Sequence, residues 1–315
     1  MKPPILLAVP NVSEGRSAPA ISAIGDAFTA KLPDGGVARL LDVHSDADHH
    51  RSVFTLAAAP RTLSEALMRG AAEAVARVDV LSRGGDRAER GQHPHVGAID
   101  VAPIVYLDAA SRGAACAEAL VLADRLGCEL AVPVFLYGEL TEDGGHRPRT
   151  RAELRRGGVV ELTRRMRAGA EGSGGDALRA DFGPGAPHPS AGATLVAARE
   201  PLVAFNLQLD AAATVQDARA IAAAIREGGE RGLGGLRAIG IELEGGVAQV
   251  SMNVERPLEL SLAEVIAAVR ALAPVAGAEL VGLAPAAALA GFPDDLPMPG
   301  FDPARHVIEN ALGWQ

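Results

Sequence analysis

The sequence contains only two cysteines among its 315 residues, Cys116 and Cys128. Two cysteines alone make neither the paired pattern of a zinc site nor the disulfide framework of a small secreted domain. We therefore expect both to be buried free thiols. Aromatic residues supply only 3% of the chain, so the core is expected to consist of Ala, Val, Leu and Ile side chains.

Lysine is nearly absent too, occurring only at Lys2 and Lys31, and the net charge is −9. This acidic balance excludes a general affinity for nucleic acid or anionic membranes, which requires a basic surface. No apolar run approaches the ~20 residues of a membrane-spanning helix. Because Pro3, Pro4 and Pro10 interrupt the first apolar run, no secretory leader is indicated, and we expect a cytoplasmic protein.

Length and composition indicate two globular domains, since 48% of the residues are apolar and 22% are charged. We expect a first domain over residues 1–178 and a second over residues 179–315, with the Gly- and Pro-rich stretch 169–192 as the linker. In the first domain, apolar runs predict strands at 5–9, 37–43, 52–58, 101–107 and 130–137. Helices are expected from residue 17 and at 62–77, 112–126 and 148–166.

The second half repeats this order of elements. Strands are expected at 194–198, 202–209, 236–243, 248–254 and 279–283, and helices at 214–227 and 262–272. The βαββαβ order is that of split βαβ folds. The sequence therefore predicts an α+β protein of two ferredoxin-like α/β subdomains, each a mixed sheet with helices packed on it.

Histidines gather in two polar segments. The segment DVHSDADHHRS contains His44, His49 and His50, but it lacks the fixed helical spacing of common zinc motifs, so a solvated loop is favoured over a metal site. In GQHPHVGAID, Pro94 restricts His93 to extended geometry at the entrance of a strand. An imidazole held there suits proton transfer near neutral pH, although a loop histidine that caps a carbonyl fits these residues equally well.

Other polar residues follow the predicted strands directly. Asn11, Ser13 and Glu14 lie between the first strand and a helix whose amino end attracts anions, although plain helix capping is the alternative. Asp42 lies near the carboxyl end of the second strand and Arg51 at the start of the third. Both are expected at the same rim of the sheet, where Arg51 suits a substrate carboxylate.

Eight segments, taken in order, resemble the glutamate formimidoyltransferase family over nearly the whole chain. They are VPNVSEGR, LLDVHSDADHHRSVFTLA, HPHVGAIDVAPIVYL, PVFLYGE, DFGP…HPSAGAT, PLVAFNLQL, AQVSMNV and LVGLAPAAAL. The resemblance implies a homodimer of chains with two α+β subdomains, tetrahydrofolate as co-substrate between the subdomains, a formimidoyl amino acid as donor, and no metal.

The resemblance also assigns residues. The histidine of the family's His-Pro motif corresponds to His93 as the catalytic acid-base, and by their chemistry Asp42 or Asp100 would orient its imidazole. By their chemistry, contacts to the donor are expected from Arg51, Asn11, Ser13, Glu14 and His44. The resemblance implies contacts to folate from Gly183, Pro184, Pro189, Ser190 and Gly192, and Asn206 is added to them by its chemistry.

Several positions depart from the family pattern. Gln92 stands where members carry an acidic residue, and His95 where they carry an arginine. His50 replaces an asparagine, Ala191 replaces a residue that is Trp in some members, and SRGGDRAERG is longer than usual. The departures around His93 leave two alternatives open: a folate-dependent transferase with another donor such as 5-formyltetrahydrofolate, and a folate-binding protein without activity.

Overall fold

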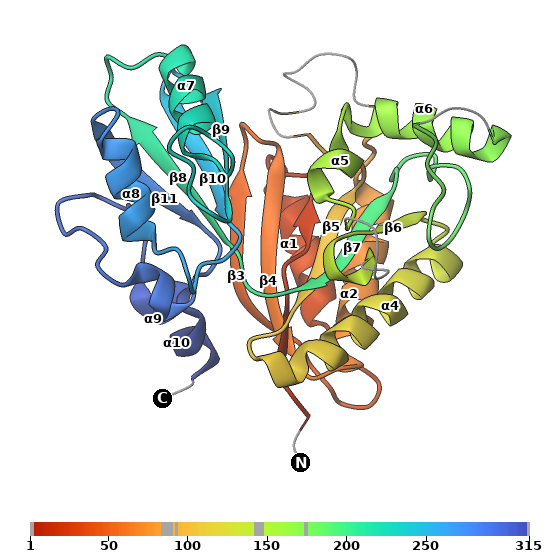
Figure 1. Cartoon of the computed structure of the whole chain (residues 1–315). Helices are drawn as coiled ribbons and strands as arrows, with labels where there is room; N and C mark the ends of the chain where they lie inside the picture. The colour runs from red at the N-terminus through yellow and green to blue at the C-terminus, as the bar shows by residue number, and fades with distance from the viewer. Residues whose placement is uncertain (1–2, 83–90, 92–93, 142–147, 173–175, 314–315) are drawn as a thin grey trace. The chain divides into compact units, whose positions relative to one another are not determined.

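The computed structural model of the chain describes residues 3–82, 91, 94–141, 148–172 and 176–313. The chain divides into two compact units, Met1–Arg199 and Glu200–Gln315 (Figure 1). Among the described helices, none has the length and apolar character needed to cross a membrane.

The first unit is built on a seven-stranded sheet. Its strands are β1 (Leu6–Ala8), β2 (Asn11–Val12), β3 (Arg39–Asp46), β4 (Arg51–Ala58), β5 (Ile99–Val105), β6 (Val134–Leu136) and β7 (Thr194–Arg199). Its helices are α1 (Ala18–Thr29), α2 (Thr62–Arg77), α4 (Arg112–Glu129), α5 (Arg151–Arg155) and α6 (Gly158–Glu171), with 3-10 turns η1 (Ala109–Ser111) and η2 (Gly138–Thr141).

The strand order of this sheet contains a ferredoxin-like core. Strands β1 and β2 act as one interrupted strand, because both pair antiparallel with β4 on one side and with β5 on the other. Strand β3 pairs antiparallel with β4. The first and third strands of the βαββαβ unit are therefore central, as in ferredoxin-like folds. Strand β7 then pairs in parallel with β5 and with β6, which makes the sheet mixed.

Helices α1, α2 and α4 cover one face of this sheet (Figure 1). Helix α1 begins at the expected cap, since the Ser17 hydroxyl accepts a hydrogen bond from the backbone N–H of Ala20. Buried Phe28 of α1 packs against Phe54 of β4, with ring centroids 5.2 Å apart. Most of the core is aliphatic, as the composition predicts.

The single helix expected at 148–166 is instead two helices, α5 and α6. Gly157 and Gly158 separate them and adopt φ angles of 75° and 66°. This left-handed conformation interrupts a right-handed helix and is adopted readily only by glycine. The break lets the short α5 and the longer α6 run in different directions (Figure 1).

The stretch 169–192 was expected as a linker between domains, but its described residues, 169–172 and 176–192, pack within the first unit. Leu178 N–H donates to the carbonyl of Arg165, and Val134 N–H donates to that of Phe182. Strand β7 follows and pairs with β5 and β6. The observed division therefore lies at 199/200, whereas the expected boundary is at 178/179, because the parallel pairing of β7 ties residues 179–199 to the first sheet.

The second unit has a four-stranded sheet. Its elements are β8 (Val203–Leu209), α7 (Val215–Ile225), β9 (Leu236–Glu242), β10 (Ala248–Val254), α8 (Leu262–Arg270), β11 (Val275–Val281), η3 (Ala286–Leu289), α9 (Pro303–His306) and α10 (Ile308–Leu312). The strand order β11-β8-β10-β9 is again ferredoxin-like, and every pairing is antiparallel, so this sheet is not mixed. Helices α7 and α8 share one core with the strands. The predicted α+β fold of two α/β subdomains is confirmed.

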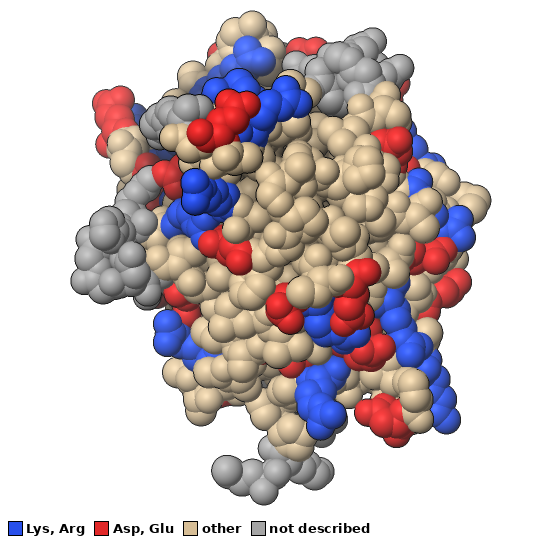
Figure 2. Space-filling model, turned by 90° about the vertical axis from the view of Figure 1, so that its right-hand side faces the viewer, with Lys and Arg blue, Asp and Glu red and all other residues tan. Residues whose placement is uncertain are grey.

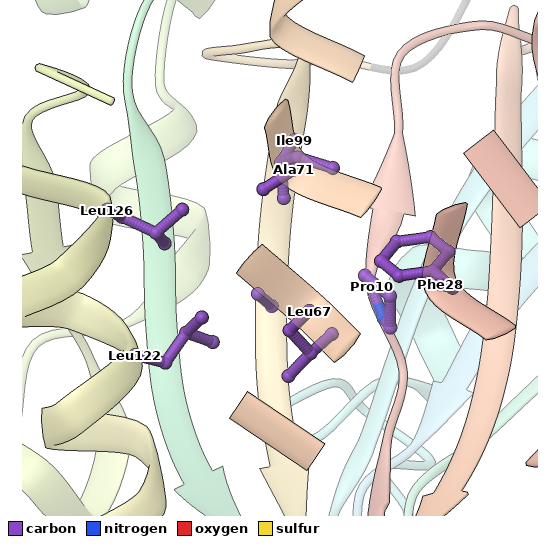
Figure 3. A pocket seen from close by; sticks show the side chains of 8 residues that line it. Pro10, Phe28, Leu67, Ala71, Ile99, Leu122 and Leu126 are labelled. Carbon is purple, nitrogen blue, oxygen red and sulfur yellow. The ribbon is translucent and has the colours of Figure 1, made fainter. Parts of the chain in front are cut away.

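A narrow pocket lies between the first sheet and its helices (Figure 3). Its lining is wholly apolar and consists of Pro10, Phe28, Leu67, Ala71, Ile99, Ala102, Leu122 and Leu126. Without a polar group, this pocket offers no chemistry, and it is a packing gap in the core rather than an active site.

The two cysteines are free thiols, but they are not buried as expected. Cys116 is partly buried and Cys128 is exposed. The Cys128 thiol donates a hydrogen bond to the Asp124 carboxylate, 3.6 Å away. Both residues lie on α4, one face of which is solvent-exposed.

Candidate active site

Polar side chains gather on the face of the first sheet opposite to helices α1, α2 and α4. In an antiparallel sheet, residues directly opposite each other share a face. His44 pairs with Val53, Val53 with Asn11, and Asn11 with Val101. Because Phe54 points into the helix-covered core, its neighbour Val53 and this whole row point to the other face.

Two more pairs extend this polar face along β3 and β4. Asp42 lies opposite Thr55, and Asp46 lies opposite Arg51. Asp42 and Thr55 are buried, and Arg51 is partly buried. The register therefore places Asn11, Asp42, His44 and Arg51 on one face of the sheet, but Asp42 lies in the middle of β3, and Asp46 is the residue opposite Arg51 at the rim.

The turn between β3 and β4 contains a dense hydrogen-bond network. The His49 Nδ1 atom lies 2.5 Å from Oδ2 of Asp46, whose Oδ1 accepts from the His49 backbone N–H. Burial alone would raise the pKa of Asp46, but these hydrogen bonds outweigh it and lower the pKa to about 2. His50 adopts φ 50°, and its Nδ1 accepts from the Gly15 N–H at 3.1 Å.

Glu14 is engaged at the start of α1. Its carboxylate accepts from the backbone N–H groups of Arg16 and Ser17, at 2.8 and 2.9 Å, and its Oε1 lies 3.6 Å from Nδ1 of His50. A negative charge at a helix amino end is favourable. The capping alternative therefore accounts for these contacts of Glu14.

A second cluster joins the sheet to α5. Asp100 and Arg155 form an ion pair in which both side chains are more than nine-tenths buried. The other oxygen of Asp100 accepts from the Val96 N–H at 2.8 Å. The cluster also contains Arg51, which interacts electrostatically with Arg155, Asp46, Asp100 and Arg151.

Positive charge is in excess in this cluster. Burial, followed by the charge of Arg155, lowers the pKa of Arg51 to about 10, which leaves Arg51 protonated at neutral pH. Among the charges that act most strongly here, three are the guanidinium groups of Arg51, Arg151 and Arg155, and two are the carboxylates of Asp46 and Asp100. Among the described residues, no side-chain hydrogen bond or ion pair holds the Arg51 guanidinium. A partly buried arginine that forms no ion pair with any described carboxylate is suited to bind the carboxylate of a ligand.

Ser13 connects this region to the Gly-rich segment expected to contact folate. Its hydroxyl donates to the carbonyl of Gly97 at 2.7 Å. Gly97 forms an antiparallel bridge with Gly192, and a Cβ atom at Gly97 would lie 1.9 Å from the carbonyl oxygen of Ala193. The two backbones can approach this closely only because residue 97 lacks a side chain.

The remaining residues of the expected folate segment extend away from this bridge. The Ser190 carbonyl accepts from the Val80 N–H, and its own N–H lies 3.3 Å from Nδ1 of His188. Gly183 packs against Gly127 of α4. Gly183 and Pro189 are exposed, whereas Pro184 is partly buried.

Asn206 belongs to β8 of the second unit. Its Nδ2 donates to the Glu279 carboxylate at 2.7 Å. Asn206 also pairs with Ser251, and Gln208 pairs with Gln249, on the face that alternates with the apolar core residues. Gln249 is 1% exposed, and within the described residues neither its Nε2 nor its Oε1 has a hydrogen-bond partner.

The expected catalytic residue, His93, lies outside the described residues, as does Gln92. Of the residues on either side, Gly91 lies against His49 and His50, since a Cβ atom there would be 2.5 Å from the His49 carbonyl oxygen. His95 is 7% exposed, and its carbonyl lies beside Gly158 at the start of α6.

Sequence reasoning missed Arg155 and Tyr137. Arg155 was part of a helix expected to cross away from the first domain, and Tyr137 was the end of an expected strand. Arg155 is buried against Asp100 on the short α5, which the adjacent pair Gly157 and Gly158 separates from α6, and Tyr137 is buried in the apolar cluster next to β6.

Metal binding has no visible site in the described part of the chain, where no three His, Cys, Asp or Glu side chains are placed to hold an ion together. The surface around α4 and α6 interleaves the two signs of charge (Figure 2). Arg125 pairs with Glu65 and Glu129, and Arg164 pairs with Glu161. This face therefore presents no basic patch for an anionic macromolecule.

Comparisons with known proteins agree with the family resemblance. Residues 5–199 match the profile of the formiminotransferase domain, N-terminal subdomain, and residues 204–292 match that of the formiminotransferase domain. The chain is 34% identical to a glutamate formimidoyltransferase of Streptococcus pyogenes, covering 98% of each chain. It is 30% identical to a glutamate formimidoyltransferase of Thermoplasma acidophilum, covering 89% of this chain and 88% of the relative.

A longer relative matches over part of its length. The chain is 36% identical to the formimidoyltransferase-cyclodeaminase of Sus scrofa over 89% of its own residues. It spans about half the length of that relative, since the match covers 50% of it.

Proposed function

The chain belongs to the formiminotransferase family, and we propose that it transfers the formimidoyl group of N-formimidoyl-L-glutamate to N5 of tetrahydrofolate, giving 5-formimidoyltetrahydrofolate and glutamate. This reaction is a step of histidine degradation and one-carbon metabolism. The observation that carries the proposal is the match to a glutamate formimidoyltransferase over 98% of both chains. The excess of buried positive charge around Arg51 supports it, because the donor is a dicarboxylate.

Proton transfer is the role proposed for His93. Tetrahydrofolate supplies the N5 amine that takes up the one-carbon group. His93 accepts the proton that N5 loses and returns it to the departing amino nitrogen of glutamate. One positioned acid-base group contributes about 10²–10⁴-fold, so the alignment of two bound substrates supplies much of the remainder. Asp42 or Asp100 orients the imidazole in this proposal.

The donor side of the proposed site lies on the polar face of the first sheet. Arg51 binds a carboxylate of the donor, and Asn11, Ser13 and His44 line the same region. The support for Arg51 is its electrostatic setting, since it is partly buried among cations and no carboxylate pairs with it among the described residues. Glu14 contributes by holding the start of α1.

The folate side of the proposed site includes Gly183, Pro184, Pro189, Ser190 and Gly192. Asn206 is proposed to contact folate from the second unit. The residues present fit such a ligand, because Gln249 on the same sheet face offers buried amide atoms that have no hydrogen-bond partner among the described residues. A pterin ring carries both donors and acceptors that an amide can satisfy.

The proposal is tested by a spectrophotometric assay for 5-formimidoyltetrahydrofolate with formimidoylglutamate as donor. We expect turnover that depends on both substrates. The same assay with 5-formyltetrahydrofolate tests the second candidate, which His95 favours because it stands in place of the family's arginine. Tight folate binding without turnover of either compound would instead indicate a binding protein.

Quaternary structure and location are also inferred from the family. We infer a homodimer in the cytoplasm, with no metal requirement. Sedimentation equilibrium tests the first inference, because a monomer at micromolar concentration would contradict it. If the enzyme requires no metal, its activity should survive exhaustive treatment with a chelator.

A further inference from the structure

Two hydrogen-bond donors in the first unit are buried without partners. They are the hydroxyl of Tyr137, a residue that is 6% exposed, and Nε of Arg155, which is also 6% exposed. Within the described part of the chain, neither atom has an acceptor. Buried polar atoms in folded proteins are nearly always satisfied, so such a pair requires an explanation.

The position of each side chain is determined by the surrounding structure. Tyr137 follows β6 directly, its N–H donates to the carbonyl of Val196, and its ring belongs to the apolar cluster that includes Val101 and Leu195. The other end of the Arg155 guanidinium is held by Asp100. Neither donor can therefore reach water by a simple rotation that preserves these contacts.

Tyr137 and Arg155 lie close enough to interact electrostatically, and Arg155 interacts in the same way with Arg51. The group that would satisfy these donors must be an acceptor. Arg51, Arg151 and Arg155 together outnumber the carboxylates of Asp46 and Asp100. The acceptor that fits best is therefore an anion. A hydroxyl and a guanidinium group are donors that proteins use to bind carboxylates.

We propose that the Tyr137 hydroxyl and Nε of Arg155 bind a carboxylate of the donor amino acid, beside Arg51. This inference rests on the proposed function for the identity of the ligand, a dicarboxylic amino acid. The two carboxylates of the formimidoyl amino acid are then bound by different side chains, one by Tyr137 and Arg155 and the other by Arg51. Tyr137 thereby becomes a specificity residue, which favours an acidic donor over the corresponding amide.

The chain offers a matched pair of tyrosines for the test. Tyr137→Phe removes only the unpartnered hydroxyl. Tyr106→Phe is the control, because the Tyr106 hydroxyl donates to Glu139 at 2.6 Å and is already satisfied within the protein. Binding is measured by calorimetry on the full chain with N-formimidoyl-L-glutamate, and separately with L-glutamate, which requires no formimidoyl chemistry.

We expect Tyr137→Phe to raise the dissociation constant of both amino acids about tenfold or more, as for the loss of a hydrogen bond to a charged group. The donor KM should rise likewise, while the KM of tetrahydrofolate stays unchanged. The melting temperature of the Tyr137→Phe protein without ligand should equal or exceed that of the wild type, since the lost hydroxyl has no hydrogen-bond partner in the described part of the chain. Tyr106→Phe should leave both dissociation constants unchanged.

Two results would overturn the inference. One is wild-type affinity for both amino acids in the Tyr137→Phe protein, and the other is a wild-type protein that binds neither. A third result separates this inference from the proposed function: glutamate binding that depends on Tyr137, without turnover of any formimidoyl donor, supports the carboxylate site and contradicts the transferase. Arg155→Lys, which keeps the charge but lacks Nε, should weaken binding in the same direction.

Discussion

Asp100→Asn should destabilise the first unit strongly. The substitution keeps the size of the side chain but removes the charge that compensates Arg155, and both residues are more than nine-tenths buried. In the variant, the amide oxygen can still accept from the Val96 N–H, which directs the amide NH₂ group at the guanidinium. Two donors then face each other in the place of an ion pair.

The expected cost follows from this burial. Removing one partner of a buried ion pair costs about 3–5 kcal/mol, because an uncompensated charge is left in the interior. The first unit extends to Arg199, and a domain of this size loses roughly 2–4 °C of melting temperature per kcal/mol. We therefore expect its transition to fall by about 6–20 °C, measured by calorimetry and by urea unfolding followed with circular dichroism.

Two further variants make the result specific. Asp176→Asn breaks the ion pair between Asp176, which is 54% exposed, and Arg156, which is 61% exposed. It should lower the free energy of unfolding by less than about 1 kcal/mol. The double variant Asp100→Asn with Arg155→Met should be more stable than Asp100→Asn alone, since it removes the stranded charge. An Asp100→Asn protein within about 1 kcal/mol of the wild type would refute this reasoning.

Three other predictions concern single residues. Gly97→Ala should disrupt the packing against Ala193 and lower the melting temperature, whereas Gly113→Ala, where a Cβ meets open space on α4, should be neutral or stabilise by up to about 1 kcal/mol. Because the pKa of Asp46 is lowered in the folded protein, its carboxylate stabilises the fold fully above pH 4. This contribution, up to about 2 kcal/mol, is lost as the pH falls toward 2. The unfolding free energies of Asp46→Asn and wild type, measured by urea titration, should therefore converge near pH 2. His93→Ala should reduce turnover at least a hundredfold while folate binding persists in equilibrium dialysis; near-normal turnover would exclude His93 as the acid-base.

Much of the fold could be predicted from local patterns. The helix expected at 62–77 is observed as α2 with the same bounds, and the helix expected from residue 17 begins with Ser17 as its cap. Apolar runs also located the strands of both ferredoxin-like cores except β2, which was expected as a polar turn. These elements are determined by periodicity and capping, which are properties of neighbouring residues.

Long-range pairing accounts for what the patterns did not predict. Residues 194–198 resemble the first strand of a second domain, because nothing local indicates that β7 pairs in parallel with β5. The Gly- and Pro-rich stretch before it resembles a linker for the same reason. The shared face of Asp42 and Arg51 follows from the β3–β4 hairpin, but the register sets Asp46 rather than Asp42 opposite Arg51, because β3 continues four residues beyond Asp42.

The candidate site shows the same limit at the level of side chains. Arg51 could be selected from the sequence because it directly follows a polar turn and opens a strand. Nothing in the sequence distinguishes Arg155 from the many other arginines. The apolar run that ends at Tyr137 predicts a core position for the ring but does not predict whether its hydroxyl has a hydrogen-bond partner. Arg155 acquires its importance from burial beside Asp100, which lies far from it in sequence, and Tyr137 from its interaction with Arg155. A buried charge needs a partner, and the excess of cations over carboxylates around Asp100 can be counted only when the three segments are seen together.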